Sequence, residues 1–235
     1  MGKGDVFFVS GIGTDVGKSV VTGMMARWLL SQECDVITVK LVQTGNDGCS
    51  EDIKTHRRMM GGVCFPEDSA GLTAPQIFKF PSSPLLAARL EGREIDLVKI
   101  ASSVETCAAA HDVTLVEGAG GLCVPLTKEL LTADFVAEQG WPLVLVTCGS
   151  LGAINHALLS LEAVKSRGIS LAGVVHNSYF SKDTRLDEDA VEAISRHLAR
   201  LGFPARIVCI PRCDTLESCS SVDFSAILSL NSAVE

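Results

Sequence analysis

A glycine-rich loop that ends in lysine and serine carries the clearest chemistry in this sequence. The run Gly11-Ile12-Gly13-Thr14-Asp15-Val16-Gly17-Lys18-Ser19 lies between the apolar residues 5–10 and a segment with helical spacing, residues 19–32. In a strand–loop–helix arrangement, the unpaired N–H groups of the loop and of the first helical turn converge on a polyphosphate. Lys18 would reach the terminal phosphates, and the Ser19 hydroxyl would bind Mg²⁺. We therefore predict a phosphate-binding loop, although its first glycine comes one residue early; the alternative is a tight turn with a surface lysine.

Three charged residues farther along the chain could act on the bound phosphates. Glu117 and Lys40 each come directly after an apolar run, and Asp52 lies in a polar stretch. The carboxylates could bind Mg²⁺, and Lys40 could stabilise the charge of a transferring phosphoryl group. The alternatives are a solvated acid at the end of a strand and a lysine that extends from the surface into water.

Strand-like and helical segments alternate along the chain and must position these residues. Short apolar runs, typical of buried strands, occur at residues 5–10, 35–40, 113–117, 143–147, 171–177 and 206–210. Helical spacing occurs at residues 19–32, 83–91, 97–110, 155–166 and 187–201. Part of the long segment 44–81, which contains several glycines and prolines, is predicted to be an active-site loop. The alternation predicts one α/β P-loop domain over residues 1–235, with a mostly parallel sheet and helices on both faces. Since ligands bind at the carboxyl ends of parallel strands, the polar residues after each run should share one site.

Composition and charge narrow the functional class. The 235 residues carry a formal net charge of −8, and no cluster of Lys and Arg relieves this acidity, which argues against a nucleic-acid partner. The apolar runs are too short to span a membrane, and the N-terminus has no signal-peptide pattern. The nine cysteines form no C-x-x-C pair, which favours reduced thiols. We expect a cytoplasmic protein that binds neither nucleic acid nor membrane.

Four motifs together resemble the dethiobiotin synthetase family of biotin biosynthesis, over nearly the whole chain. They are the glycine-rich loop, Val39-Lys40-Leu41-Val42-Gln43-Thr44-Gly45, Val116-Glu117-Gly118-Ala119-Gly120-Gly121 and Leu151-Gly152-Ala153-Ile154-Asn155-His156. The resemblance implies a homodimeric carbon–nitrogen ligase that uses ATP and Mg²⁺ and acts on 7,8-diaminononanoate with CO₂ or bicarbonate. One amine would capture CO₂ as a carbamate, and the carbamate oxygen would attack the γ-phosphate. The second amine would then expel phosphate and close a cyclic urea.

The same resemblance assigns roles to individual residues. Lys18 and Lys40 would be catalytic, with Lys40 stabilising the carbamate and the transferring phosphoryl group. The magnesium ligands would be Ser19, Asp52 and Glu117. The residues implied to bind the nucleotide are Thr14, Asp15, Val16, Gly17, Lys18, Ser19, Val20, Asp52, Glu117, Gly118, Ala119, Gly120, Asn177, Ser178, Pro211, Arg212 and Cys213. The residues implied to bind the diamine are Thr44 and, from the neighbouring subunit at the dimer interface, Leu151, Gly152, Ala153, Ile154 and Asn155.

Two departures from the family accompany this resemblance. The family uses a tyrosine in the helix after Asn177, and residues 187–201 contain none. The cysteine-rich end, with Cys213 and Cys219, also differs from the family, so a nucleoside triphosphate other than ATP is conceivable.

Two other functions are compatible with a phosphate-binding loop. A partition- or septum-site-type switch ATPase would bind DNA or membrane, but such proteins usually carry a second lysine early in the loop and, where they bind membrane, a basic C-terminal helix. Here positions 12 and 13 are Ile12 and Gly13, and residues 224–235 contain no Lys or Arg. A cobyrinate-type amide ligase normally has an added glutamine-hydrolysing domain, for which 235 residues leave no room.

Overall fold

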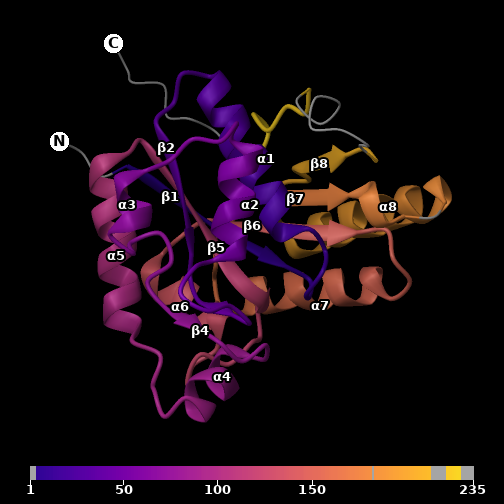
Figure 1. Ribbon diagram of the computed structural model, residues 1–235. Coiled ribbons are helices and arrows are strands. Elements are labelled where there is room, and N and C mark those ends of the chain that lie inside the picture. Colours follow the sequence, from indigo (N-terminus) through magenta and orange to yellow (C-terminus); the bar gives the residue numbers. More distant parts are fainter. Residues whose placement is uncertain (1–3, 182, 213–220, 229–235) are drawn as a thin grey trace.

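The computed structural model describes residues 4–181, 183–212 and 221–228, and a parallel sheet of six strands lies at its centre. The strands are β1 (Asp5–Gly11), β2 (Val36–Lys40), β5 (Val113–Gly121), β6 (Leu143–Cys148), β7 (Leu171–Asn177) and β8 (Ile207–Ile210). They lie in the order β2-β5-β1-β6-β7-β8, and every neighbouring pair is parallel (Figure 1). This arrangement confirms the predicted α/β fold with a mostly parallel sheet.

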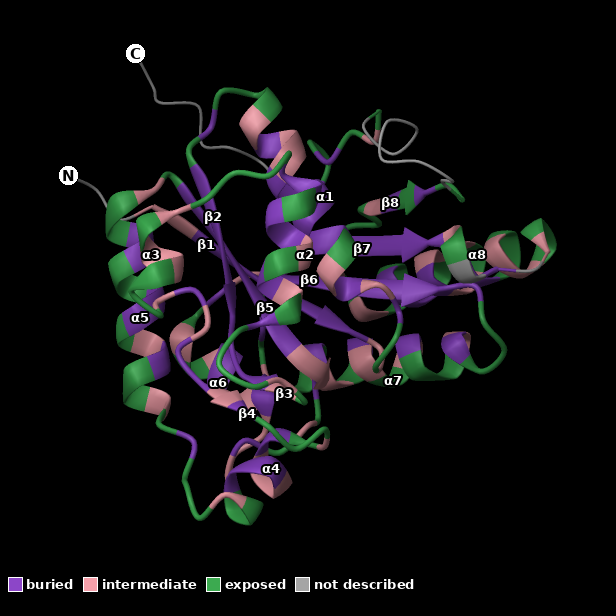
Figure 2. Ribbon diagram, viewed as in Figure 1, coloured by how far each residue is buried: buried purple, intermediate pink, exposed green. Residues whose placement is uncertain are grey.

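Helices cover both faces of the sheet, because successive strand residues point to opposite faces. In β1, Val6 and Phe8 belong to an apolar cluster that includes residues of α5 (Leu97–Ala110), α6 (Thr132–Gln139), α7 (Ala153–Ser166) and α8 (Thr184–Leu201). Phe7 and Val9 belong to a second cluster, which includes residues of α1 (Lys18–Ser31). Figure 2 shows the buried strands between helices whose outer faces are exposed.

The segment 44–81, for which the sequence predicted an active-site loop but no helix or strand, contains regular elements. It contains α2 (Glu51–Met59), α3 (Pro66–Ser69) and β4 (Ile77–Phe78), and β4 pairs with β3 (Gln43–Thr44) in a separate parallel sheet. The Ser50 hydroxyl caps α2 by accepting a hydrogen bond from the backbone N–H of Ile53 at 3.1 Å. The rest of the chain includes α4 (Pro84–Leu90) and a 3₁₀ turn, η1 (Ser178–Phe180).

Helix α2 packs closely on α1 because α1 has a glycine at the contact. A Cβ atom at Gly23 would lie only 2.5 Å from Cβ of Met59, the last residue of α2. This contact holds α2 against α1, the helix that begins at the glycine-rich loop.

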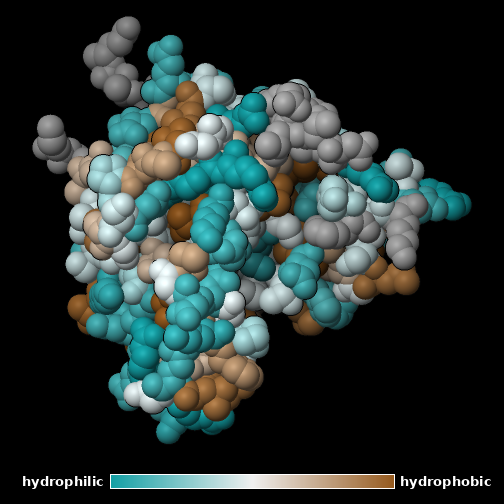
Figure 3. Space-filling view, viewed as in Figure 1, coloured by the Kyte–Doolittle hydropathy of each residue, from teal (hydrophilic) through white to brown (hydrophobic). Residues whose placement is uncertain are grey.

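The surface shows where apolar side chains remain in contact with water. In Figure 3 the surface over α2 is mainly hydrophilic, and hydrophobic side chains gather near α4 and at the start of α7. The described helices include none whose length and hydrophobicity would let it cross a membrane.

Candidate active site

The glycine-rich loop joins β1 to α1 at the carboxyl edge of the sheet. Gly17, directly before α1, has a φ of 89°, a left-handed conformation that glycine adopts without strain. A Cβ atom at Gly11 would lie 2.6 Å from Cγ2 of Val16, so glycine is required where the loop folds back. Among the described residues, no side chain caps α1, and its first N–H groups are therefore available to an anion.

Lys18 folds back over this loop. Its Nζ donates a hydrogen bond to the Gly13 carbonyl oxygen at 2.6 Å, and the residue is buried. Burial and the neighbouring charge of Lys40 lower the pKa of Lys18 to about 8. A lysine whose charged form is disfavoured in this way gains stability when a phosphate binds beside it.

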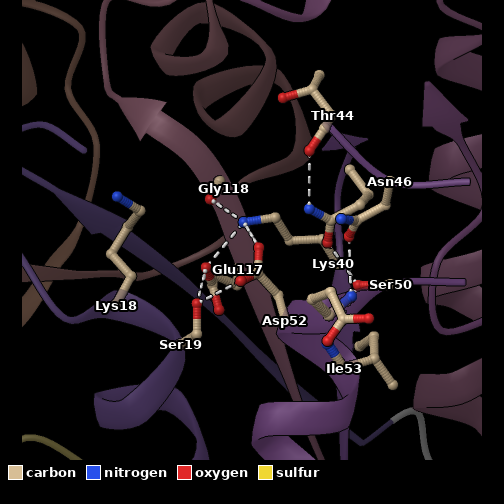
Figure 4. Close-up of polar contacts among 12 residues, drawn as sticks. Lys18, Ser19, Lys40, Thr44, Asn46, Ser50, Asp52, Ile53, Glu117 and Gly118 are labelled. Atoms are coloured by element: carbon tan, nitrogen blue, oxygen red, sulfur yellow. Dashed lines mark hydrogen bonds and ion pairs between the residues drawn. The ribbon is translucent and has the colours of Figure 1, made fainter. Parts of the chain in front are cut away.

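Lys40 and Glu117 meet because their strands are neighbours, and they are paired in the register of β2 and β5. The Lys40 Nζ lies 2.8 Å from Oε1 of Glu117 and 2.7 Å from Oδ2 of Asp52, and it donates to the Gly118 carbonyl oxygen at 3.0 Å (Figure 4). Lys40 is 4% exposed and Glu117 is 1% exposed. Neither residue is the solvated charge that was the alternative interpretation of its position in the sequence.

The charges in this cluster keep one another ionised. Burial alone would lower the pKa of Lys40, but the carboxylates of Glu117 and Asp52 outweigh burial and raise it. Burial alone would raise the pKa of Glu117, but the charge of Lys40 and a hydrogen bond from His56 hold the pKa of Glu117 well below its ordinary value. The pair therefore stays charged across neutral pH.

The oxygen atoms around Ser19 fit a magnesium ion. The Ser19 Oγ lies 2.8 Å from Oδ1 of Asp52 and 3.0 Å from Oε1 of Glu117. The described residues contain no group of three His, Cys, Asp or Glu side chains that could hold a metal by themselves. One or two carboxylates with a hydroxyl and phosphate oxygens is, however, the ligand set that Mg²⁺ commonly takes in nucleotide sites.

These residues open into a cavity of about 880 Å³. That volume is within the range of small-molecule sites. Its lining includes half of the predicted residues: Thr14, Asp15, Gly17, Lys18, Ser19, Val20, Lys40, Thr44, Asp52, Glu117, Ala119 and Gly120. Residues that were not predicted line it too, namely Val42, Gln43, Thr55, Arg58, Pro81 and Ser82.

Known proteins share both the sequence and the fold of this chain. A family model described as an AAA domain matches residues 5–218. An ATP-dependent dethiobiotin synthetase of Chlorobaculum tepidum is 49% identical over 201 residues, which cover 86% of this chain and 84% of that protein. The chain belongs to the dethiobiotin synthetase family. An ATP-dependent dethiobiotin synthetase of Haemophilus influenzae is 46% identical over 183 residues, covering 78% of this chain and 96% of that protein.

Solved structures at low identity share the fold alone. A ParA family ATPase from Chlorobium tepidum aligns with a TM-score of 0.53 and 18% identity, over 92% of this chain and 90% of that one. Membership of the dethiobiotin synthetase family, a family of ATP-dependent ligases, rests on the much higher identities above. The comparisons therefore favour the synthetase over both the switch ATPase and the cobyrinate-type amide ligase.

Among the residues that the synthetase family would use for the nucleotide base, Asn177 contacts the glycine-rich loop but does not line the cavity. Asn177 ends β7, and its Nδ2 donates to the Val16 carbonyl oxygen at 3.0 Å. Ser178 begins η1, while Pro211 and Arg212 follow β8 and are exposed. Cys213, predicted for the same role, lies outside the described residues.

The start of α7, which the synthetase family would use for the substrate carboxylate, does not line this chain's cavity. Leu151 is 90% exposed, and residues 151–155 form the end of the loop between β6 and α7 and the first turn of α7. Their role toward a neighbouring subunit stays a prediction. The family tyrosine is absent from α8, although Tyr179 lies in η1, only two residues after Asn177.

Sequence reasoning missed the histidine behind Glu117. His56 lies on α2 one turn after Asp52, is fully buried, and its Nε2 lies 2.6 Å from Oε2 of Glu117. The signal that could have found it is the serine cap at Ser50 followed by acidic residues, which indicates a helix start. On that helix the spacing of four residues places Asp52 and His56 on one face.

Proposed function

We propose that this chain is an ATP-dependent dethiobiotin synthetase that closes the cyclic urea of dethiobiotin from 7,8-diaminononanoate and CO₂, releasing ADP and phosphate. The observation that carries the proposal is the cluster of Lys18, Lys40, Ser19, Asp52 and Glu117 in one cavity, in a chain 49% identical to a named synthetase. The cluster supplies cations, a hydroxyl and carboxylates where a triphosphate and an anionic acceptor would meet. Phosphoryl transfer needs such groups, because the reaction depends on positioning the reactants and stabilising their charge.

Each residue of the cluster would have its own role in the reaction. The loop N–H groups and Lys18 would bind the β- and γ-phosphates. Ser19, Asp52 and Glu117 would hold Mg²⁺, which supplies positive charge to the phosphate oxygens. Lys40 would stabilise the carbamate that one amine forms with CO₂, and then the γ-phosphoryl group as the carbamate oxygen bonds to it and the bond to ADP breaks. The second amine attacks the carbamoyl carbon, phosphate leaves, and the ring closes.

The nucleotide base would lie at the ends of β7 and β8. Asn177, already held to the loop through Val16, would contact the base together with Ser178, Pro211, Arg212 and Cys213. ATP is the expected nucleotide because the relatives are named as ATP-dependent.

The diamine would lie between two subunits of a homodimer. Thr44 lines the cavity of one subunit, and the first turn of α7 in the neighbouring subunit would receive the substrate carboxylate. Among the described residues, no side chain caps the start of α7 at Gly152, so its N–H groups can bind a carboxylate. The exposed Leu151 at the same turn supports an interface there.

We further propose that the enzyme works in the cytoplasm. The seven cysteines within the described residues are all free thiols. Free thiols agree with a reducing compartment.

The test is phosphate release from Mg-ATP with bicarbonate, measured with and without 7,8-diaminononanoate. Release should require both the diamine and bicarbonate, because the phosphoryl acceptor exists only after the carbamate forms, and mass spectrometry should detect dethiobiotin. If ATP hydrolysis does not depend on the diamine and is stimulated by DNA or lipid vesicles, the protein is a switch ATPase and this proposal is wrong.

A further inference from the structure

A chain of buried hydrogen bonds runs from Glu117 away from the cavity. The Nε2 of His56 lies 2.6 Å from Oε2 of Glu117, and the Nδ1 of His56 lies 2.9 Å from Oγ1 of Thr38. Arg57 donates from Nη1 to the same Thr38 oxygen at 2.7 Å, and it is held by Asp68 at 2.7 and 2.8 Å. His56 and Thr38 are fully buried, so the contacts of His56 with Glu117 and Thr38 are shielded from water.

The hydrogen-bond partners fix which nitrogen of His56 carries a proton toward Glu117. An ionised carboxylate only accepts hydrogen bonds, so at 2.6 Å the Nε2 of His56 must be the donor. Arg57 only donates, so the Thr38 oxygen accepts from it, and the Thr38 hydroxyl hydrogen is left for the Nδ1 of His56. Both ring nitrogens of His56 and the Thr38 hydroxyl then have a partner.

Because of these hydrogen bonds, the two carboxylate oxygens of Glu117 contact different partners. Oε2 is taken by His56, while Oε1 faces Ser19 at 3.0 Å and Lys40 at 2.8 Å. A carboxylate held by one oxygen cannot rotate freely, so the other oxygen keeps a fixed direction toward the cavity. Because α2 also carries Asp52, one helix delivers a metal ligand and the group that orients a second one.

We propose that His56 is a positioning residue that holds Glu117 so that its Oε1 faces the magnesium ion, with Thr38 fixing the donor nitrogen of His56. The inference rests on the proposed function, since it needs the magnesium site at Ser19, Asp52 and Glu117. Hydrogen-bond partners that orient metal ligands typically affect metal affinity by about 10–100-fold. His56 contacts neither substrate nor nucleotide in this arrangement; it acts through Glu117.

The test measures metal binding directly. Electron paramagnetic resonance follows Mn²⁺, a probe that replaces Mg²⁺, as it binds to the full chain saturated with ADP. Calorimetry follows ADP binding in EDTA, without metal. The variants are His56→Leu, which removes the donor, and His56→Gln, which keeps an N–H that can reach Glu117. His197→Leu is the matched control, because His197 is a buried histidine paired with Glu162 between α7 and α8.

We expect His56→Leu to weaken Mn²⁺ binding about 10–100-fold while metal-free ADP binding changes less than about threefold. His56→Gln should recover most of the loss, and His197→Leu should bind Mn²⁺ normally. If His56→Leu does not fold, the comparison is made with Thr38→Val, which should weaken Mn²⁺ binding, and Thr38→Ser, which keeps the hydroxyl and should not. Equal Mn²⁺ affinity in wild type and the foldable variants would overturn the inference. Failure of the wild type to bind Mn²⁺ with ADP would instead overturn the magnesium site and the inference with it.

Discussion

Replacing Lys40 with methionine should lower both stability and turnover, and the contacts of Lys40 explain each loss. The substitution keeps the length of the side chain and removes an ammonium that lies 2.8 Å from Glu117 and 2.7 Å from Asp52. Lys40 and Glu117 are almost fully buried, so water cannot replace the lost partner of Glu117. Removing one partner of a buried ion pair costs about 3–5 kcal/mol. We expect the free energy of unfolding to fall by that amount, a large share of the roughly 5–15 kcal/mol typical of a domain.

A second substitution separates the two roles of Lys40. In Lys40→Met combined with Glu117→Gln, neither charge remains, and the side-chain carbonyl oxygen of the introduced glutamine can still accept a hydrogen bond from His56. Buried ion pairs replaced on both sides are often close to neutral in stability. We therefore expect the double variant to be more stable than Lys40→Met by about 2 kcal/mol or more. Turnover should not return, because the double variant lacks the carboxylate that we assign to magnesium as well as the cation at the transferring phosphoryl group, which by itself contributes on the order of 10²–10³ in rate.

The assay combines urea unfolding, followed by circular dichroism, with initial rates of phosphate release at saturating diamine, bicarbonate and Mg-ATP. Nucleotide affinity is measured separately, since removing Lys40 should lower kcat more than it weakens ADP binding. A double variant no more stable than Lys40→Met would refute the ion pair as the source of the stability loss. Turnover of Lys40→Met close to wild type would leave Lys40 a structural counterion and remove the centre of the mechanism.

Two further predictions concern Lys18 of the phosphate loop and the contact between α1 and α2. The pKa of Lys18, lowered to about 8, should make ADP binding take up a proton above pH 8, because a bound phosphate stabilises the ammonium and raises its pKa. ADP affinity should therefore fall as pH rises through 8, and calorimetry in buffers of different ionisation enthalpy should detect the uptake in wild type but not in Lys18→Gln. Gly23→Ala places a Cβ 2.5 Å from Met59 and should lower the free energy of unfolding by about 1–3 kcal/mol despite the better helix propensity of alanine. Thermal unfolding checks this, and a higher midpoint would show that α1 and α2 have room to separate.

The sequence allowed the sheet and the loop to be predicted because their signals are local. Continuous apolar runs identified the strands of the large sheet, and the order strand, glycine-rich loop, helix identified α1, which was predicted over residues 19–32 and spans Lys18–Ser31. Parallel strands end at one edge, so Lys40 and Glu117 were expected at the same site, and the structure pairs them across β2 and β5. Their catalytic roles stay predictions.

The burial of the charged cluster could not be predicted in the same way. Glu117 was expected at the end of a strand, but β5 continues to Gly121, because its glycines extend the strand rather than end it. Hydrophobic patterns detect apolar burial, whereas Glu117 and Lys40 are buried as charged groups because distant residues satisfy them, above all each other across 77 residues of chain. A contact between residues so far apart in the sequence produces no recognisable pattern in the residues around either one.

Helix α2 was missed for a related reason. Its sequence is mostly polar, and the glycines and prolines around it suggested a loop. The helix is nevertheless stable because its buried residues are satisfied by distant ones, His56 by Glu117 and Thr38, and Arg57 by Thr38 and Asp68. Here the polar contacts of the site also fix the fold of the segment that builds it.

The charges that line the cavity show why the backbone of the glycine-rich loop is as important for nucleotide binding as the lysines of the cavity. The ionisable side chains among the described residues that line the cavity are three cations and three carboxylates: Lys18, Lys40, Arg58, Asp15, Asp52 and Glu117. They balance one another, and the whole chain carries a net charge of −8, so side chains alone give an anionic nucleotide little reason to enter. The positive potential must then come from the uncapped N–H groups at the start of α1 and from the magnesium ion that we propose the carboxylates bind. With that ion bound, the carboxylates would not oppose nucleotide binding, because they would hold a divalent positive charge beside the phosphates.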